Sequence, residues 1–318
     1  MSQEKFLVIG ACGQVGSELC EQLRSQYSDD QVIAADIKTP SEELKAAGPF
    51  EELDVLAPQR VLEVVKKHQI TQIFQLAAML SATAEQQPMF GWKLNMEGLL
   101  NVLNIAKDNG VKRIFWPSSI AVFGPGTPKE HTPQDTVMDP NTVYGISKLA
   151  GERWCEYYYD KYDLDVRSIR YPGLISYKTM PGGGTTDYAI DIFVKALQDG
   201  HYDCFLGKGT SLPMLFMPDA VKATIDIMHA SAADVKVRSS YNLTGFSFTP
   251  EELAEKIKQH LPNFTIAYEP DFRQQIADSW PSSIDDSQAT QDWGWKPAFS
   301  LDDMVKEMLD QFKQKLKV

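Results

Sequence analysis

The chain has 318 residues, enough for one or two domains, and its 43% hydrophobic and 23% charged residues are typical of globular proteins. Its 31 Lys and Arg residues against 43 Asp and Glu residues give a net charge of −12. This charge argues against nucleic acid or an anionic membrane as a partner. No apolar run approaches the roughly 18 residues that a membrane-spanning helix needs.

Metal and disulfide sites are not expected. The four cysteines, Cys12, Cys20, Cys155 and Cys204, form no C-x-x-C pair, and the five histidines form no H-x-x-x-H pattern. Scattered thiols in a chain of this length indicate a reducing compartment. Because the first residues lack the layout of a signal peptide, we expect a cytoplasmic protein. From the cysteine and histidine patterns we expect no bound metal.

The first half of the chain alternates short apolar runs with amphipathic stretches. The apolar runs predict strands at 6–9, 32–35, 73–76, 113–117 and 166–170. Apolar residues at helical spacing predict helices at 15–26, 58–68, 94–109 and 144–159. Strands that are apolar throughout and alternate with helices predict an α/β fold, a doubly wound parallel sheet of the Rossmann type.

The second half is less regular and begins after a glycine-rich break at 181–184. Helices are predicted at 189–197, 219–229, 250–260 and 301–315, with one clear strand at 241–243 and a loop at 282–287. We therefore expect a first domain at 1–175, with later segments near 215–245 added to its sheet, and a smaller α-rich lobe at 176–318.

Three glycines lie between the first strand and the first helix. Gly10, Gly13 and Gly16 would permit a tight turn and let backbone N–H groups approach a pyrophosphate. The helix N-terminus, with Gln14 and Val15, would add partial positive charge there. A plain turn is the alternative, but the position between strand and helix favours a dinucleotide site.

Two carboxylates come next along the chain as candidate cofactor ligands. Asp36 ends the second strand, 20 residues after the last of these glycines, where it would bind both ribose hydroxyls and repel a 2′-phosphate. This favours NAD over NADP, although Lys38 could partly offset the repulsion. Asp54 and Val55 are placed to meet the adenine. The alternative for Asp54 is a helix cap before Pro58.

A phenol and an ammonium lie four residues apart at Tyr144 and Lys148, on one face of a predicted helix. The lysine charge, beside an oxidised nicotinamide, would lower the pKa of the tyrosine and make it a base. Ser118 and Ser119, at the end of a strand, could hold a substrate oxygen in line with the phenol. Asn95 could support a water or backbone group near Lys148. A solvated helix face is the alternative for the Tyr–Lys pair.

Together these motifs resemble the extended short-chain dehydrogenase/reductase family, in its UDP-galactose 4-epimerase-like branch. The resemblance rests on the glycine spacing, Ser119 and the Tyr144-x-x-x-Lys148 pair. It implies catalytic roles for Ser119, Tyr144 and Lys148, NAD as cofactor and a C-terminal substrate lobe. The cofactor-binding residues then include Leu76, Ala77, Ala78, Asn95, Tyr144, Lys148, Tyr171 and Pro172.

Further motifs resemble the short-chain L-threonine 3-dehydrogenases. They lie at 170–176, 181–189, 247–253, 279–281 and 292–295, and the run P-G-G-G-T-T-D-Y-A is the most specific. The resemblance implies oxidation of the L-threonine 3-hydroxyl to 2-amino-3-ketobutyrate. Its substrate-binding residues would be Ser81, Ser118, Ser119, Tyr144, Gly184, Thr185, Thr186 and Trp280.

Other interpretations of these features stay open. A nucleotide-sugar epimerase would need arginines for two phosphates, for which Arg238 and Arg273 are the main candidates; a dehydratase would need an acid after Ser119, where Ile120 stands. A non-catalytic NAD-binding regulator would not need all three catalytic groups. Trp280 could be a core residue, and the glycine-rich break a surface turn.

The oligomeric state can be inferred from two of the predicted helices. Those at 94–109 and 144–159 carry apolar residues beyond one stripe, including Trp154, Tyr157 and Tyr158. In the resembled family such a pair forms a dimer interface, so we expect a homodimer. The alternative is that the two helices only cover the sheet.

Overall fold

The computed structural model describes residues 4–178 and 184–317, which fold as two compact units. The first unit comprises the residues up to Ser119 together with Thr142–Arg170 and Val221–Tyr241. The second comprises Ile120–Asn141, Tyr171–Ala220 and the residues from Asn242 onward. We expected residues 1–175 to form one continuous domain, whereas residues 120–141 belong to the second unit.

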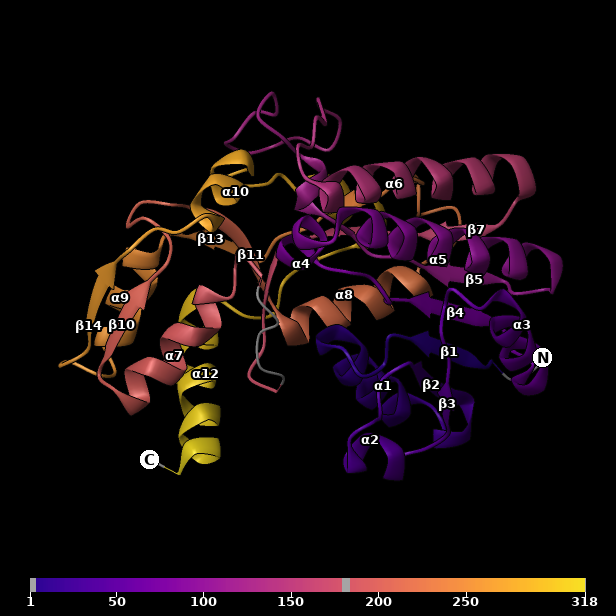
Figure 1. The fold of residues 1–318 in the computed structure, drawn as a ribbon, viewed down its shortest axis with the longest axis horizontal. Coiled ribbons are helices and arrows are strands. Elements are labelled where there is room, and N and C mark those ends of the chain that lie inside the picture. Colours follow the sequence, from indigo (N-terminus) through magenta and orange to yellow (C-terminus); the bar gives the residue numbers. More distant parts are fainter. Residues whose placement is uncertain (1–3, 179–183, 318) are drawn as a thin grey trace. The chain divides into compact units, whose positions relative to one another are not determined.

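The first unit is built on six parallel strands in the order β3-β2-β1-β4-β5-β7, which confirms the doubly wound parallel sheet (Figure 1). These strands are β1 (Phe6–Ile9), β2 (Val32–Asp36), β3 (Phe50–Glu52), β4 (Gln72–Gln75), β5 (Arg113–Phe115) and β7 (Asp165–Arg167). Every residue of β1 and β2 is buried, as expected for central strands covered on both faces. The chain order reverses between β1 and β4, where doubly wound sheets bind their ligands.

Helices cover both faces of this sheet. They are α1 (Gln14–Gln26), α2 (Glu42–Ala46), α3 (Pro58–His68), α4 (Ser81–Gln86), α5 (Pro88–Asp108), α6 (Val143–Tyr162) and α8 (Met217–His229). In Figure 1, α3, α5 and α6 lie on one side of the strands, and α1 and α8 on the other. One core cluster joins Leu7 and Ile33 of the sheet to Val61 of α3, Leu99 of α5 and Tyr158 of α6. Burial of this apolar surface is what holds the helices on the sheet.

The strand predicted at 166–170 is in fact two strands in different sheets. β7 pairs with β5 in the large sheet, whereas β8 (Ile169–Tyr171) lies between β6 (Ser118–Ser119) and β12 (Tyr241–Asn242). Ser168 separates the two, and its buried hydroxyl lies 2.9 Å from that of Ser240. A polar residue between the two short strands marks the change of sheet, which the apolar pattern alone does not reveal.

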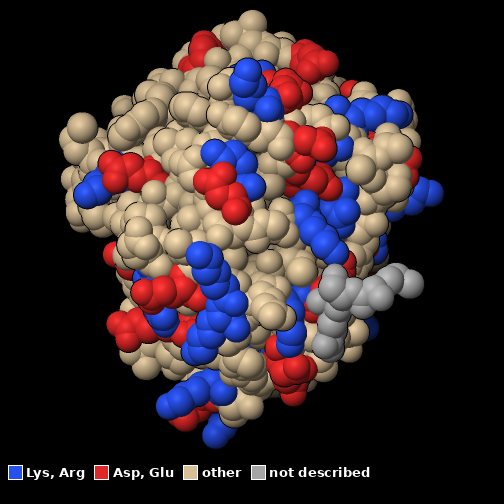
Figure 2. Space-filling model, turned by 90° about the vertical axis from the view of Figure 1, so that its right-hand side faces the viewer, with Lys and Arg blue, Asp and Glu red and all other residues tan. Residues whose placement is uncertain are grey.

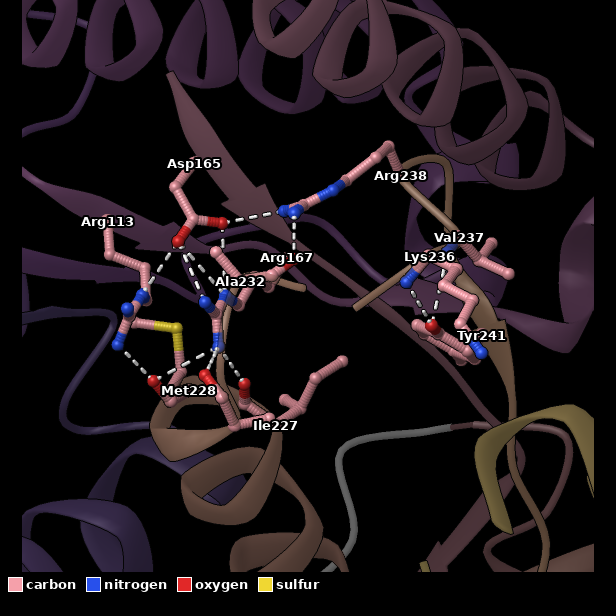
Figure 3. A network of polar contacts seen from close by, with 11 residues as sticks. Arg113, Asp165, Arg167, Ile227, Met228, Ala232, Lys236, Val237, Arg238 and Tyr241 are labelled. Atoms are coloured by element: carbon pink, nitrogen blue, oxygen red, sulfur yellow. Dashed lines mark hydrogen bonds and ion pairs between the residues drawn. The ribbon is translucent and has the colours of Figure 1, made fainter. Parts of the chain in front are cut away.

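A polar network fixes α8 to the strands β5 and β7 (Figure 3). The Asp165 carboxylate accepts hydrogen bonds from Arg113 at 2.9 Å, from Arg167 at 2.8 Å and from Arg238 at 2.7 Å. Arg167 also donates to the carbonyls of Ile227 and Ala230, and Arg113 donates to that of Met228. Arginines at a helix C-terminus satisfy its last carbonyls and complement its dipole.

The second unit contains more strands than the sequence predicts. A three-stranded sheet has the order β13-β11-β9, and β10 pairs in parallel with β14. Its elements are β9 (Gly173–Ile175), α7 (Tyr188–Gln198), β10 (His201–Cys204), β11 (Leu212–Phe216), β13 (Phe246–Phe248), α9 (Pro250–Lys258), β14 (Thr265–Tyr268), α10 (Arg273–Ser279), α11 (Ser287–Trp293) and α12 (Leu301–Leu316). The expectation of an α-rich lobe with one clear strand was therefore wrong in its strand content. Of the glycine-rich break, residues 181–183 lie outside the described residues.

On the face drawn in Figure 2, Lys and Arg side chains are interspersed with Asp and Glu. No helix within the described residues combines the length and apolar character that a membrane crossing requires. All four cysteines are free thiols, and Cys20, Cys155 and Cys204 are buried.

Candidate functional site

The three glycines form a close-packed turn from β1 into α1. Gly10 has φ +88°, and a Cβ there would lie 2.8 Å from the Ala77 nitrogen. A Cβ on Gly16 would lie 2.2 Å from the Gly10 carbonyl oxygen, so only glycine fits. No side chain caps the N-terminus of α1 at Gly13. The turn therefore brings a helix N-terminus close to the carboxyl ends of β1 and β4, as a pyrophosphate site requires.

Asp36 is tied to this turn. Its carboxylate accepts hydrogen bonds from the backbone nitrogens of Cys12 and Lys38, both at 2.9 Å, and the residue is only 8% exposed. Each carboxylate oxygen has further lone pairs, which suit the two ribose hydroxyls of NAD. The Lys38 backbone thus helps to orient the carboxylate. The turn and the fixed carboxylate together fit a dinucleotide.

Asp54 and Val55 lie after β3, and the structure favours the local interpretation of Asp54. The Asp54 carboxylate is exposed and accepts a hydrogen bond from the Leu56 nitrogen at 2.8 Å. The N-cap of α3 is Ala57, so Asp54 stabilises the turn before the helix without capping it directly. Val55 is buried, and its carbonyl accepts a hydrogen bond from Asn101 of α5. An adenine contact for either residue stays a prediction.

Residues 76–78 follow β4 and are half-buried beside the glycine turn. The Leu76 nitrogen donates to the Ile9 carbonyl at 2.9 Å, which fixes this segment next to β1. Asn95 of α5 bonds both backbone groups of Met79 and donates to the Ser147 hydroxyl at 3.0 Å. Asn95 therefore joins the loop after β4 to α6 at Ser147, the residue before Lys148, and its support of a water near Lys148 stays a prediction.

Tyr144 and Ser119 come together as predicted. Ser119 ends β6 and Tyr144 lies in the first turn of α6, where their side chains are hydrogen-bonded. The Thr142 hydroxyl caps this helix by accepting from the Gly145 nitrogen at 3.1 Å, and Ser147 donates to the Tyr144 carbonyl at 2.7 Å. Tyr144 is 9% exposed, which excludes the alternative of a solvated helix face.

Lys148 lies one turn further along α6 and is almost fully buried. Its ammonium donates to the Pro117 carbonyl at 2.5 Å and lies 4.5 Å from the centre of the Trp116 ring and 5.5 Å from that of Tyr144. Carbonyl and ring faces both stabilise a cation. The amine is therefore held beside the phenol by the strand that leads into Ser119.

The pKa shifts in the protein alone run opposite to the sequence expectation for Tyr144. Burial raises the pKa of Tyr144 to about 12, although the hydrogen bond with Ser119 opposes this rise. Burial also lowers the pKa of Lys148 to about 7, against the influence of Cys155 and Glu152. Desolvation thus favours the neutral form of each group. A base at Tyr144 thus needs additional positive charge nearby.

Ser118 does not face the predicted site. Its side chain is 1% exposed and donates to the Glu152 carboxylate of α6 at 2.6 Å. Glu152 also forms two hydrogen bonds of 2.9 Å with the Arg170 guanidinium. Neighbouring strand residues point to opposite faces, which separates the side chains of Ser118 and Ser119. The Ser118 hydroxyl is thus engaged by Glu152, and its substrate contact stays a prediction; sequence reasoning missed Glu152 and Arg170.

Ser81 is the remaining predicted substrate residue of the first unit. It is the first residue of α4 and is 6% exposed. In the same helix, Glu85 accepts a hydrogen bond from the Val143 nitrogen at 2.6 Å, so α4 contacts the start of α6.

The other predicted substrate residues belong to the second unit. Thr185 is 1% exposed, and its hydroxyl is a buried oxygen without a hydrogen-bond partner among the residues that the structure describes. The Gly184 nitrogen donates to the Asp187 carboxylate at 2.5 Å, and Thr186 packs against Gly173. An unpaired buried hydroxyl is costly, so Thr185 is a group for which a ligand could supply the missing partner.

Trp280 follows α10, and its backbone carbonyl is bound by a lysine from another part of the second unit. Its carbonyl and that of Asp278 accept hydrogen bonds from the Lys129 ammonium, at 3.2 Å and 3.0 Å. Trp280 is only 7% exposed, so it serves as a core residue of the second unit in the structure described. Tyr171, the last residue of β8, and Pro172, which separates β8 from β9, are also buried, and their cofactor contacts stay a prediction.

No group of three or more His, Cys, Asp or Glu side chains among residues 4–178 and 184–317 is arranged to hold a metal ion. The polar groups that the site does offer are backbone nitrogens, one carboxylate and the Ser119–Tyr144–Lys148 set. They suit a dinucleotide and a proton transfer.

Comparisons with known proteins agree with this geometry. An uncharacterised epimerase/dehydratase of Staphylococcus aureus (strain USA300) is 46% identical over 98% of both chains. A partial consensus L-threonine 3-dehydrogenase is 53% identical, covers 98% of this chain and 99% of its own, and superposes with a TM-score of 0.95. A GalE-like L-threonine dehydrogenase from Cupriavidus necator, in its holo form, is 52% identical, with coverages of 97% and 100% and the same TM-score.

The family follows from a match over most of the chain. The model of the NAD dependent epimerase/dehydratase family matches residues 6–243, which include the glycine turn, Asp36, Ser119, Tyr144 and Lys148. The chain is thus an enzyme of the NAD dependent epimerase/dehydratase family, and NAD is its cofactor.

Proposed function

We propose that this enzyme oxidises L-threonine at its 3-hydroxyl, forming 2-amino-3-ketobutyrate and NADH. The observation that carries the proposal is the hydrogen-bonded pair Ser119–Tyr144 with Lys148 held beside it. The similarity to L-threonine 3-dehydrogenases over nearly the whole chain supports the choice of substrate.

The chain's own residues account for the proton transfer. Ser119 would hold the hydroxyl oxygen of the substrate, and Tyr144 would take its proton as the C–H bond of the same carbon breaks. Bound NAD⁺ would supply the acceptor for the hydride and a positive charge near the phenol. Lys148, protonated, would add a second positive charge and so favour the phenolate that burial disfavours. Tyr144 is thus the base, and Lys148 sets how readily it ionises.

The cofactor is held by groups on the first unit. The N-terminal turn of α1 would receive the pyrophosphate, and Asp36 the adenosine ribose. Gly10 leaves no Cβ against Leu76 and Ala77 in the loop after β4, and Gly16 leaves none against the Gly10 carbonyl.

Two arginines argue against a nucleotide-sugar substrate. Arg238 is already bound to Asp165 at 2.7 Å and lies over the Tyr159 ring. Arg273 forms hydrogen bonds of 2.6 Å and 3.0 Å with Asp271 and lies over the Phe205 ring. Each arginine is thus already held in an ion pair within its own unit, whereas the buried Thr185 hydroxyl suits a small polar substrate. We therefore infer a small hydroxy amino acid rather than a nucleotide sugar.

The test compares substrates in the parent and in Tyr144→Phe. We expect the parent to form NADH with L-threonine and to leave UDP-galactose unchanged. The variant should bind NAD as the parent does and lose roughly 10²–10⁴-fold in turnover, because general-base catalysis is lost. Conversion of UDP-galactose without threonine oxidation would favour an epimerase instead. NAD binding with no turnover of either substrate would favour a regulator.

We also propose that the enzyme is a homodimer through α5 and α6. Both helices bury one face on the sheet, yet Phe90 and Trp92 of α5 and Trp154, Tyr157 and Tyr162 of α6 stay 39–47% exposed. Exposed aromatic groups of this kind are enriched at protein interfaces. Sedimentation of the parent beside Trp154→Lys would test this, since a charge at the interface should yield monomers.

A further inference from the structure

A buried ion pair lies directly behind the catalytic strand and helix. Glu152 is 0% exposed and Arg170 1%, and their side chains meet through two hydrogen bonds of 2.9 Å. Removing two charges from water costs several kcal/mol per ion, which their mutual attraction often fails to repay. Apolar residues of similar size would stabilise such a core equally well. The pair therefore calls for a role other than stability.

The contacts of this pair lead to the catalytic groups. Glu152 lies four residues after Lys148, on the same face of α6. Lys148 donates to the Pro117 carbonyl, and Ser118 donates to Glu152 at 2.6 Å. Two successive residues, Pro117 and Ser118, which lead into Ser119, are thus bound by two successive turns of the helix. The next residue of the strand, Ser119, is the one that bonds Tyr144.

Glu152 also acts on Lys148 through charge. Burial lowers the pKa of Lys148, while Cys155 and Glu152 raise it. Burial raises the pKa of the Cys155 thiol far above neutral pH, so Cys155 carries no charge there. Of the described groups that act on Lys148, Glu152 is then the negative one. Arg170 of β8 bonds Glu152, and Trp116 and Tyr144 present their rings to the Lys148 ammonium.

We propose that Glu152, clamped by Arg170, is a positioning residue that holds Ser119 against Tyr144 and keeps the Lys148 ammonium charged. The inference rests on the proposed roles of Ser119, Tyr144 and Lys148. The buried pair then serves catalysis instead of stability. The charge of Glu152 acts on Lys148, and its hydrogen bond with Ser118 fixes the strand that carries Ser119.

The first test is Glu152→Gln, which keeps the side-chain size and an acceptor for Ser118 but removes the charge. Without the negative charge the pKa of Lys148 falls further, so less ammonium is present at neutral pH and Tyr144 ionises only at higher pH. The rising limb of the pH profile for threonine oxidation should move up by about 0.5–1 pH unit. Turnover at pH 7 should fall about 3- to 10-fold, with the KM for NAD within twofold.

A second readout needs no turnover. In protein labelled with ¹³C at lysine, the Cε resonance of Lys148, assigned through Lys148→Met, reports the protonation of its amine. The titration midpoint should fall by about 0.5–1 unit in Glu152→Gln. The matched control is Glu51→Gln, another buried carboxylate in an ion-pair cluster of the first unit, on β3 at the other edge of the sheet. That control should leave both the profile and the Lys148 resonance unchanged.

If Glu152→Gln does not fold, Glu152→Met combined with Arg170→Met and Ser118→Ala removes the whole network and leaves no charge unpaired. We expect this variant to fold and to show the same alkaline shift. A pH profile and a Lys148 resonance identical to those of the parent, in either variant, would overturn the inference. Full activity in Tyr144→Phe would instead overturn the proposed function, so the two failures are distinguishable.

Discussion

Substitution of Gly16 by alanine tests the packing of the glycine turn. A Cβ at this position would lie 2.2 Å from the Gly10 carbonyl oxygen and 2.8 Å from the Ala11 Cα, and both atoms are backbone. Ordinary contact starts near 3.4 Å, so α1 and β1 must separate by about 1 Å. Overpacking of this kind costs about 1–3 kcal/mol. If this cost falls on the NAD-binding geometry, the affinity for NAD drops roughly 5- to 150-fold.

The measurement is the dissociation constant of NADH, followed by the fluorescence of the bound nicotinamide, together with the melting temperature. Gly209→Ala is the matched control, because a Cβ there meets nothing within 4 Å and its backbone has no positive φ. It should leave NADH affinity unchanged. An NADH dissociation constant within twofold of the parent in Gly16→Ala, with an unchanged melting temperature, would refute the close approach described for this turn.

Two further predictions concern carboxylates of the first unit. Asp36→Ala should weaken NAD binding and raise the relative activity with NADP, because ribose hydrogen bonds and phosphate repulsion are lost together; a parent that uses both cofactors equally would contradict this. Burial opposes ionisation of Glu51, but hydrogen bonds from Lys67, His68 and Arg60 lower its pKa from 4.5 to about 2. Its contribution to stability is thus complete above about pH 4.5 and is lost as the pH falls toward 2, so melting temperatures of the parent and Glu51→Gln should converge over that range. A difference in melting temperature between parent and Glu51→Gln that stays the same at all pH values would contradict the role of the ion-pair cluster.

Much of the fold was predictable because hydrophobic periodicity reports burial directly. The helix at Pro58–His68 was predicted with both of its ends, since Pro58 is favourable at a helix start and the basic residues at its end. The short strands of the second unit were missed. In β10 only alternate residues are buried, and a strand of four residues gives too few positions for a period to stand out.

At the site, sequence spacing located groups that lie close along the chain and missed partners that only the fold brings together. Tyr144 and Lys148 share a helix face, so their proximity follows from their spacing. Glu152 lies at the same spacing from Lys148 and would be taken from sequence as its salt-bridge partner, whereas its ion pair is with Arg170 of β8. The alternation of strand residues could have separated Ser118 from Ser119 beforehand. The pKa of Tyr144 could not be predicted, because it depends on the depth of burial.

The first unit is assembled from three separate stretches of the chain, and its last stretch ends at Tyr241. A fragment ending at residue 175 would contain all six strands of the large sheet but not the carbonyls of Ile227, Met228 and Ala230, to which Arg113 and Arg167 donate. In that fragment Arg113 and Arg167 would keep Asp165 as a partner but lose the carbonyls at the end of α8. The NAD-binding unit therefore cannot be excised by a single cut, and during synthesis it is completed only after three quarters of the chain has been made.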